Sequence, residues 1–115
     1  MTIVYGFGFL TSNIIRITFH FQNILTMKHS VILTIHGHVQ GVGFRYYVMQ
    51  KAELLGICGF VKNQPDGNVY VEAEGAPNQL ELFIKLCKQG PSHAWVEKVD
   101  IQYCPVQDFD GFRKR

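Results

Sequence analysis

The sequence has little net charge and no long apolar run, and each absence excludes a class of protein. Its 11 basic and 9 acidic side chains leave a formal net charge of +2. No general electrostatic attraction to nucleic acid or to a membrane surface is therefore expected. No stretch approaches the roughly 18–20 consecutive apolar residues that a membrane-spanning helix needs.

Cysteine is also scarce. Cys58, Cys87 and Cys104 are an odd number of thiols at wide spacing, and no Cys-x-x-Cys pair occurs. This pattern argues against a disulfide framework and against a zinc site, and it fits a reducing cytosol. We therefore expect a cytoplasmic protein without a cysteine-bound zinc.

Several catalytic motifs are missing as well. The glycines do not have the spacing of a dinucleotide-binding fingerprint, and no Gly-Lys-Ser/Thr follows them as in a Walker loop. No Ser/His/Asp order, metal-ligand cluster or carboxylate pair is evident. Any chemistry must therefore come from a different kind of site.

What is present is enough material for one folded domain. The 115 residues are 47% hydrophobic and 17% charged, values typical of a globular protein. Residues 1–27 are interpreted as an N-terminal extension, with Met27 as the functional start and residues 28–115 as the domain. Apolar residues alternate with polar ones between Ile15 and Phe21, so an added strand or an oligomer arm is the alternative.

The stretch from Gly37 to Arg45 is the most informative part of the domain. It joins a strand pattern, Val31 to Gly37, to a helical pattern that starts at Phe44. A glycine-rich turn before a helix leaves backbone N–H groups without intrahelical partners, and such groups bind a tetrahedral anion. Arg45 can close on the same anion with a forked pair of hydrogen bonds. The sequence thus suggests a phosphate-binding loop, and the alternative is a tight turn followed by a surface arginine.

The remaining patterns give the order β-α-β-β-α-β. Strands are predicted at Ile57–Asn63 and Asn68–Glu74 around a turn at 64–67, and a second helix opens at Pro77. A fourth strand follows at Val96–Tyr103, with Val99, Ile101 and Tyr103 predicted to face inward. Residues Phe109 to Arg113 are expected to add a short edge strand, and the basic cluster 113–115 is interpreted as a solvated tail. The fold class is α+β, a ferredoxin-like split β-α-β sandwich with an antiparallel sheet and two helices on one face.

This topology brings distant positions together. The strands before and after the first helix run parallel with another strand between them, so their carboxyl ends share one edge of the sheet. The loop after Gly37 and the side chain of Asn63 therefore converge. An arginine, an amide and a ring of N–H groups form an electrostatic site with little capacity for proton transfer. Such a site suits phosphoryl transfer from a substrate that carries a good leaving group.

Two stretches resemble the signatures of the acylphosphatase family. The first signature, Gly-x-Val-Gln-Gly-Val-x-Phe-Arg, is matched by residues 37–45. The second is matched by Gly59-Phe60-Val61-Lys62-Asn63, then by Gly67-Asn68-Val69 and Gly75. The resemblance covers roughly residues 30–115.

The resemblance implies hydrolysis of acyl phosphates without metal or cofactor. Arg45 and Asn63 would be the catalytic residues, Arg45 holding the phosphate and Asn63 orienting the attacking water. Inorganic phosphate would be both product and inhibitor, and we expect a monomer. The phosphate-binding set consists of His38, Val39, Gln40, Gly41, Val42, Gly43, Phe44 and Arg45.

Other residues and other functions were weighed. His38 fills the unspecified position of the signature, so a role as a catalytic base is disfavoured. Lys62 is adjacent to Asn63 in the strand and is assigned to the other face of the sheet. Trp95, Tyr46 and Tyr47 are interpreted as packing groups. An inactive phosphate-binding module is one rival function, although Arg45 and Asn63 are intact. An RNA-recognition domain is another, but its third strand would be basic and aromatic, whereas Asn68–Glu74 is acidic.

Overall fold

Alternating apolar residues build the strand at the centre of the sheet. The computed structural model describes residues 27–115, and strand β1 spans His29–His38. Its inward side chains Val31, Leu33 and Ile35 are fully buried. β1 pairs antiparallel with β3 (Val69–Gly75) on one side and with β4 (Trp95–Cys104) on the other.

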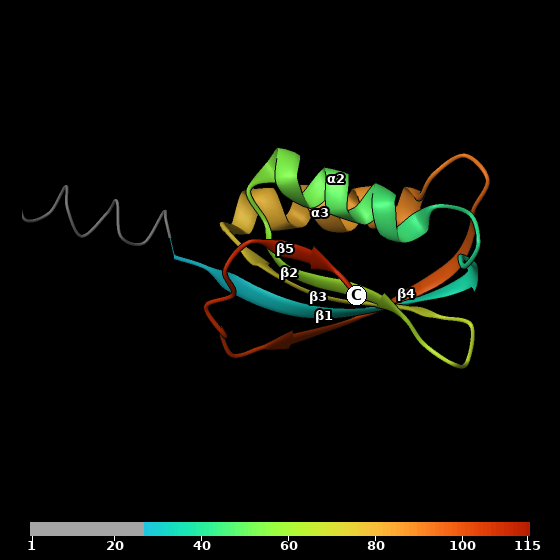
Figure 1. Ribbon diagram of the computed structural model, residues 1–115. Helices are drawn as coiled ribbons and strands as arrows, with labels where there is room; N and C mark the ends of the chain where they lie inside the picture. The colour runs from blue at the N-terminus through green and yellow to red at the C-terminus, as the bar shows by residue number, and fades with distance from the viewer. Residues whose placement is uncertain (1–26) are drawn as a thin grey trace, which may run out of the picture.

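Two helices cover one face of this sheet, and the other face is open (Figure 1). Helix α2 (Phe44–Leu55) buries Phe44, Val48 and Ala52, and it ends at Gly56 in the left-handed conformation. Helix α3 (Pro77–Gln89) has Pro77 in its first turn. Its inward stripe consists of Leu80, Phe83, Ile84 and Cys87. These elements confirm the predicted helices and the split β-α-β order.

The sheet has five strands in the order β4-β1-β3-β2-β5. β2 (Cys58–Asn63) pairs antiparallel with β3, and β3 lies between β1 and β2 as predicted. The last strand, β5 (Phe112–Lys114), pairs parallel with β2, so the sheet is mixed and not wholly antiparallel.

The last strand also begins later than the predicted range of Phe109 to Arg113. The side chain of Glu74, only 1% exposed, accepts hydrogen bonds from the backbone N–H groups of Gln107 and Phe109 at 2.7 Å each. These bonds hold residue 109 in the loop. Gly111, with φ +72°, then turns the chain into β5. A buried carboxylate therefore fixes where the strand starts.

The prediction for the fourth strand was right about facing and wrong about burial. Val99, Ile101 and Tyr103 are the register partners of Ile35, Leu33 and Val31, so they lie on the helix side. Ile101 and Tyr103 are nevertheless 39% and 65% exposed. β4 is an edge strand that helix α3 covers only in part: Val96 and Val99 pack against the core, whereas Ile101 and Tyr103 stay exposed. Trp95 and Tyr46, expected to pack, are likewise exposed.

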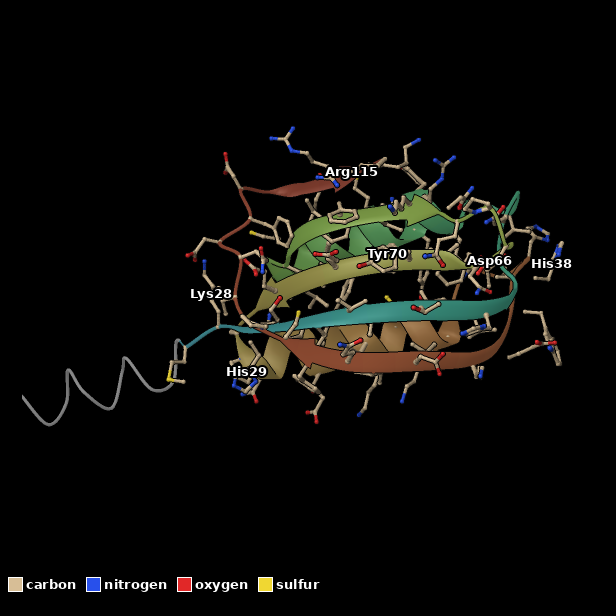
Figure 2. All side chains as sticks on the ribbon, turned by 90° about the horizontal axis from the view of Figure 1, so that it is seen from below. Lys28, His29, His38, Asp66, Tyr70 and Arg115 are labelled. Carbon is tan, nitrogen blue, oxygen red and sulfur yellow. The ribbon has the colours of Figure 1, made fainter. Side chains whose placement is uncertain are left out.

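The carboxyl ends of β1 and β2 lie at one end of the sheet. Figure 2 shows His38, the last residue of β1, and Asp66, in the turn after β2, at that end, and Lys28 and His29 at the other. Neither helix in residues 27–115 has the length and apolar character needed to cross a membrane. The strand pattern expected between Ile15 and Phe21 lies outside the described residues.

Candidate active site

The loop between β1 and α2 depends on glycines at three positions. Gly41 and Gly43 have φ of +73° and +76°, the left-handed region that favours glycine. Gly43 directly precedes the first helical residue, and the first intrahelical bond runs from the Tyr47 N–H to the Gly43 carbonyl. The N–H groups before Tyr47 are thus left free of helical partners at the positive end of the helix dipole.

Gly37 is required for a different reason. It has φ +131° at a bulge in the pairing of β1 with β4. A Cβ atom built there would lie 2.0 Å from the Trp95 carbonyl oxygen. The close approach of two backbones therefore fixes the point from which the loop departs.

Gln40 connects this loop to the turn after β2. Its Nε2 atom donates to the main-chain oxygens of Gln64 and Asn68, both at 2.8 Å. The turn itself is closed by the Gly67 N–H, which donates to the Gln64 carbonyl, and by the Gln64 N–H, which donates to Asn68. One amide side chain thereby ties the loop to the segment that begins directly after Asn63.

A cavity of about 130 Å³ opens where the loop, the start of α2 and the end of β2 meet. Its wall is formed by Val39, Gly41, Gly43, Phe44, Arg45, Tyr46, Asn63 and Lys114. The predicted convergence of the loop with Asn63 is present in this wall.

Three predicted phosphate-binding residues do not line the cavity. His38 is exposed at the last position of β1. Gln40 directs its side chain to the turn, and Val42 packs against the core. These residues shape the loop, whereas Val39, Gly41, Gly43, Phe44 and Arg45 line the cavity.

Arg45 is held by the residue that directly follows the last strand. Its Nη1 atom donates to the main-chain oxygen of Arg115 at 2.8 Å. The basic residues 113–115 are exposed to solvent as predicted, but they do not form a free tail: they belong to β5 or follow directly from it, and Lys114 lines the cavity. Alternation along the strand could have indicated the face of Lys114, because this residue stands two positions after the apolar Phe112.

The electrostatics of the cavity favour an anion. Arg45 and Lys114 are cationic, no carboxylate among residues 27–115 lines the wall, and the first turn of α2 has no acidic residue. Within residues 27–115, no group of three or more His, Cys, Asp or Glu side chains could hold a metal ion. The site can bind and orient a charged group through an arginine, an amide and backbone N–H groups.

The groups with perturbed pKa values lie outside this wall. Burial, with a smaller contribution from Cys87, raises the pKa of the Tyr47 hydroxyl, which donates to the Leu86 carbonyl at 2.9 Å. Tyr47 is thus a packing group, as predicted. Burial and the hydrogen bond to Glu72 raise the pKa of Tyr70 to about 12, on the open face of the sheet.

Comparison with known proteins finds similar sequences and similar folds. The family model described as Acylphosphatase matches residues 31–114. An acylphosphatase from a Nocardioides species is 45% identical over 89 residues, which cover 77% of this chain and 90% of the relative. The crystal structure of acylphosphatase from Bacillus subtilis superposes with a TM-score of 0.74 at 32% identity, covering 77% of this chain and 99% of that one. An acylphosphatase from Coxiella burnetii has the same TM-score at 35% identity, covering 76% and 93%.

Proposed function

The chain belongs to the acylphosphatase family and is an enzyme that hydrolyses acyl phosphates, and on this premise we propose how its own residues act. Arg45 and the amides of the 37–44 loop hold the phosphate group. Asn63 orients the water that attacks phosphorus. The observation that carries this proposal is the cavity in which Arg45, two left-handed glycines and Asn63 share one wall.

Substrate binding rests on preorganised donors. The loop glycines leave the N–H groups at the start of α2 pointing away from the helix, and the helix dipole adds positive potential there. Arg45 is kept in place by the main-chain oxygen of Arg115, which leaves the rest of its guanidinium for the phosphate oxygens. Donors fixed before the reaction cost no reorganisation as charge develops.

The reaction is a displacement at phosphorus. The oxygen of water forms a bond to phosphorus while the bond between phosphorus and the carboxyl oxygen breaks, and the carboxylate leaves with the electron pair. A carboxylate is a good leaving group, so no strong general acid is needed. The protein supplies no evident base at the cavity, and the water's proton passes to a phosphate oxygen of the substrate.

The substrate is thus an acyl phosphate and inorganic phosphate is the product. We further propose that the enzyme acts as a monomer in the cytoplasm without a metal ion. Cys58, Cys87 and Cys104 are all free thiols, which supports a reducing compartment.

Hydrolysis of benzoyl phosphate in ¹⁸O-labelled water tests this mechanism. Benzoate and phosphate should appear in equal amounts, with the label in phosphate, and a chelator should leave the rate unchanged. Label in benzoate would place the attack at carbon and contradict the assigned roles. Activity lost with chelator and restored by a divalent metal would contradict the metal-independent mechanism.

A further inference from the structure

The last strand presents one of its basic residues to the active-site cavity. Side chains alternate between faces along a strand. Phe112 faces the helices, with its ring centroid 6.1 Å from that of Phe83. Lys114, two residues on, lies on the same face and lines the cavity.

The neighbouring basic residues are directed elsewhere. The guanidinium of Arg115 lies 3.8 Å above the ring of Phe60, and Figure 2 shows Arg115 on the open side of the sheet. Arg113 shares this face by alternation and is the register partner of Phe60. Lys114 is therefore the basic residue of this strand that reaches the cavity.

Lys114 also has no carboxylate partner in the described part of the chain. The ion pairs between residues 27 and 115 are Lys28–Asp108, His36–Asp100 and Lys98–Asp100. None of the acidic residues that the structure describes lines the cavity. The ammonium of Lys114 is thus an uncompensated positive charge at the site.

The size of the cavity places this charge beside the acyl part of a substrate. The cavity has a volume of about 130 Å³ and is partly open to solvent. A phosphate bound to Arg45 and the loop amides would occupy much of this space, so the acyl group would extend outward through the opening. Two exposed side chains, Tyr46 and Lys114, stand at the rim where it emerges.

We propose that Lys114 is a specificity-determining residue that favours acyl phosphates whose acyl part carries a second negative charge. This inference rests on the proposed function, because it assigns the acyl side of the same site. The charge of the transferred phosphate is met by Arg45 and the loop amides. Lys114 meets the anionic group at the far end of the acyl chain.

The test compares 4-carboxybenzoyl phosphate with benzoyl phosphate, which differ by one carboxylate. The readout is the ratio of their kcat/KM values at low ionic strength. In Lys114→Met this ratio should fall about two- to fivefold, the effect typical of one solvent-exposed ion pair. Lys114→Arg should keep the parent ratio, and added salt should reduce the parent's preference.

Arg113→Met is the matched control, because it removes the same charge from the opposite face of the same strand. It should keep the parent ratio, which separates a local contact from the overall charge of the protein. An unchanged ratio in Lys114→Met, or an equal fall in Arg113→Met, would overturn the inference. If the parent hydrolyses neither compound, the proposed function itself fails; hydrolysis of both without a charge preference overturns only the role of Lys114.

Discussion

Arg45 supplies both charge and shape at the start of α2. Its guanidinium can form two parallel hydrogen bonds to a phosphate, which an ammonium group cannot. Arg45→Ala should lower turnover about 10²–10³-fold, the usual cost of losing one preorganised donor. Arg45→Lys should fall between the two, because it keeps the charge and loses the fork. Steady-state rates for benzoyl phosphate measure both.

Inhibition by inorganic phosphate is the second measurement on the Arg45 variant, because it reports on binding and not on turnover. Arg45→Ala should also weaken this inhibition, since the same side chain is proposed to hold the product. Arg113→Ala, which removes a positive charge on the open face, is the control and should behave like the parent. Near-normal turnover in Arg45→Ala would show that the phosphate is held elsewhere.

Asn63 is expected to act on the water and not on the bound phosphate. It is uncharged, so it contributes little to holding a dianion. Asn63→Ala should lower kcat and kcat/KM together while inhibition by phosphate stays near the parent value, the pattern of an interaction made in the transition state. Asn63→Asp should also be poor, because a carboxylate repels the substrate.

A role in the turn would give a different result for Asn63. If it only shapes residues 64–67, Asn63→Ala should lose thermal stability and keep its turnover. Lys62→Ala is the control, because Lys62 lies on the other face with its Nζ atom 5.3 Å from the centre of the Tyr70 ring. A stable Lys62→Ala variant with parent-like activity is expected.

At this scale the sequence predicts the residues whose role follows from local context. Arg45 stands just inside a helix after a glycine turn, and Asn63 ends a strand parallel to the first one, so both could be placed in advance. Lys114 and Tyr46 could not be placed at the cavity, although alternation from Phe112 gives the sheet face of Lys114. The position of Lys114 depends on where β5 joins the sheet. The exposure of Tyr46 depends on how much of the first turn of α2 is covered by other elements. Both are set by tertiary packing.

At the scale of the connecting segments, the contact of Gln40 with the turn after β2 aligns the 37–44 loop with the segment that follows Asn63. Gln40→Glu replaces a donor with an acceptor that faces the carbonyls of Gln64 and Asn68. Leaving such groups unpaired costs about 1–3 kcal/mol. The variant should unfold at lower temperature and turn over substrate more slowly, because the loop and Asn63 lose their common alignment. Thermal unfolding and kcat are the measurements.

The control for this contact is Gln64→Ala. Gln64 accepts through its main-chain oxygen, so removing its side chain should leave stability and rate near the parent. Equal losses in the two variants would mean that the turn, and not the Gln40 amide, is responsible.

Burial of whole strands was harder to predict than their facing. Val99, Ile101 and Tyr103 alternate as a buried strand would, yet β4 is the edge of the sheet and its apolar face is half uncovered. Alternation reports which face a residue takes, and it does not report how far a helix extends over that face. The parallel pairing of β5 was missed for a related reason, since a buried Glu74 side chain and a left-handed Gly111 decide it.

For the molecule as a whole, we expect residues 28–115 to carry the fold and the activity. Both signatures, all seven described elements and the complete cavity wall lie there. A variant that begins at Met27 should therefore fold cooperatively and keep the parent kcat/KM for benzoyl phosphate. Circular dichroism, thermal unfolding and steady-state kinetics check this. An insoluble or inactive shortened chain, beside an active full chain, would assign residues 1–26 to the functional unit.

The placement of β1 between β3 and β4 has a consequence for the order of events in folding. Its partners come late in the chain: Ser30 and Cys104, which pair in the sheet, are 74 positions apart. Loop-closure entropy makes such contacts slow to form, so the hairpin of β2 and β3 can assemble well before β4 reaches β1. The cavity needs the loop after β1, the end of β2 and Lys114 from β5. A refolding chain should accordingly recover catalysis only with its final, long-range strand pairing, after most of its helix has formed.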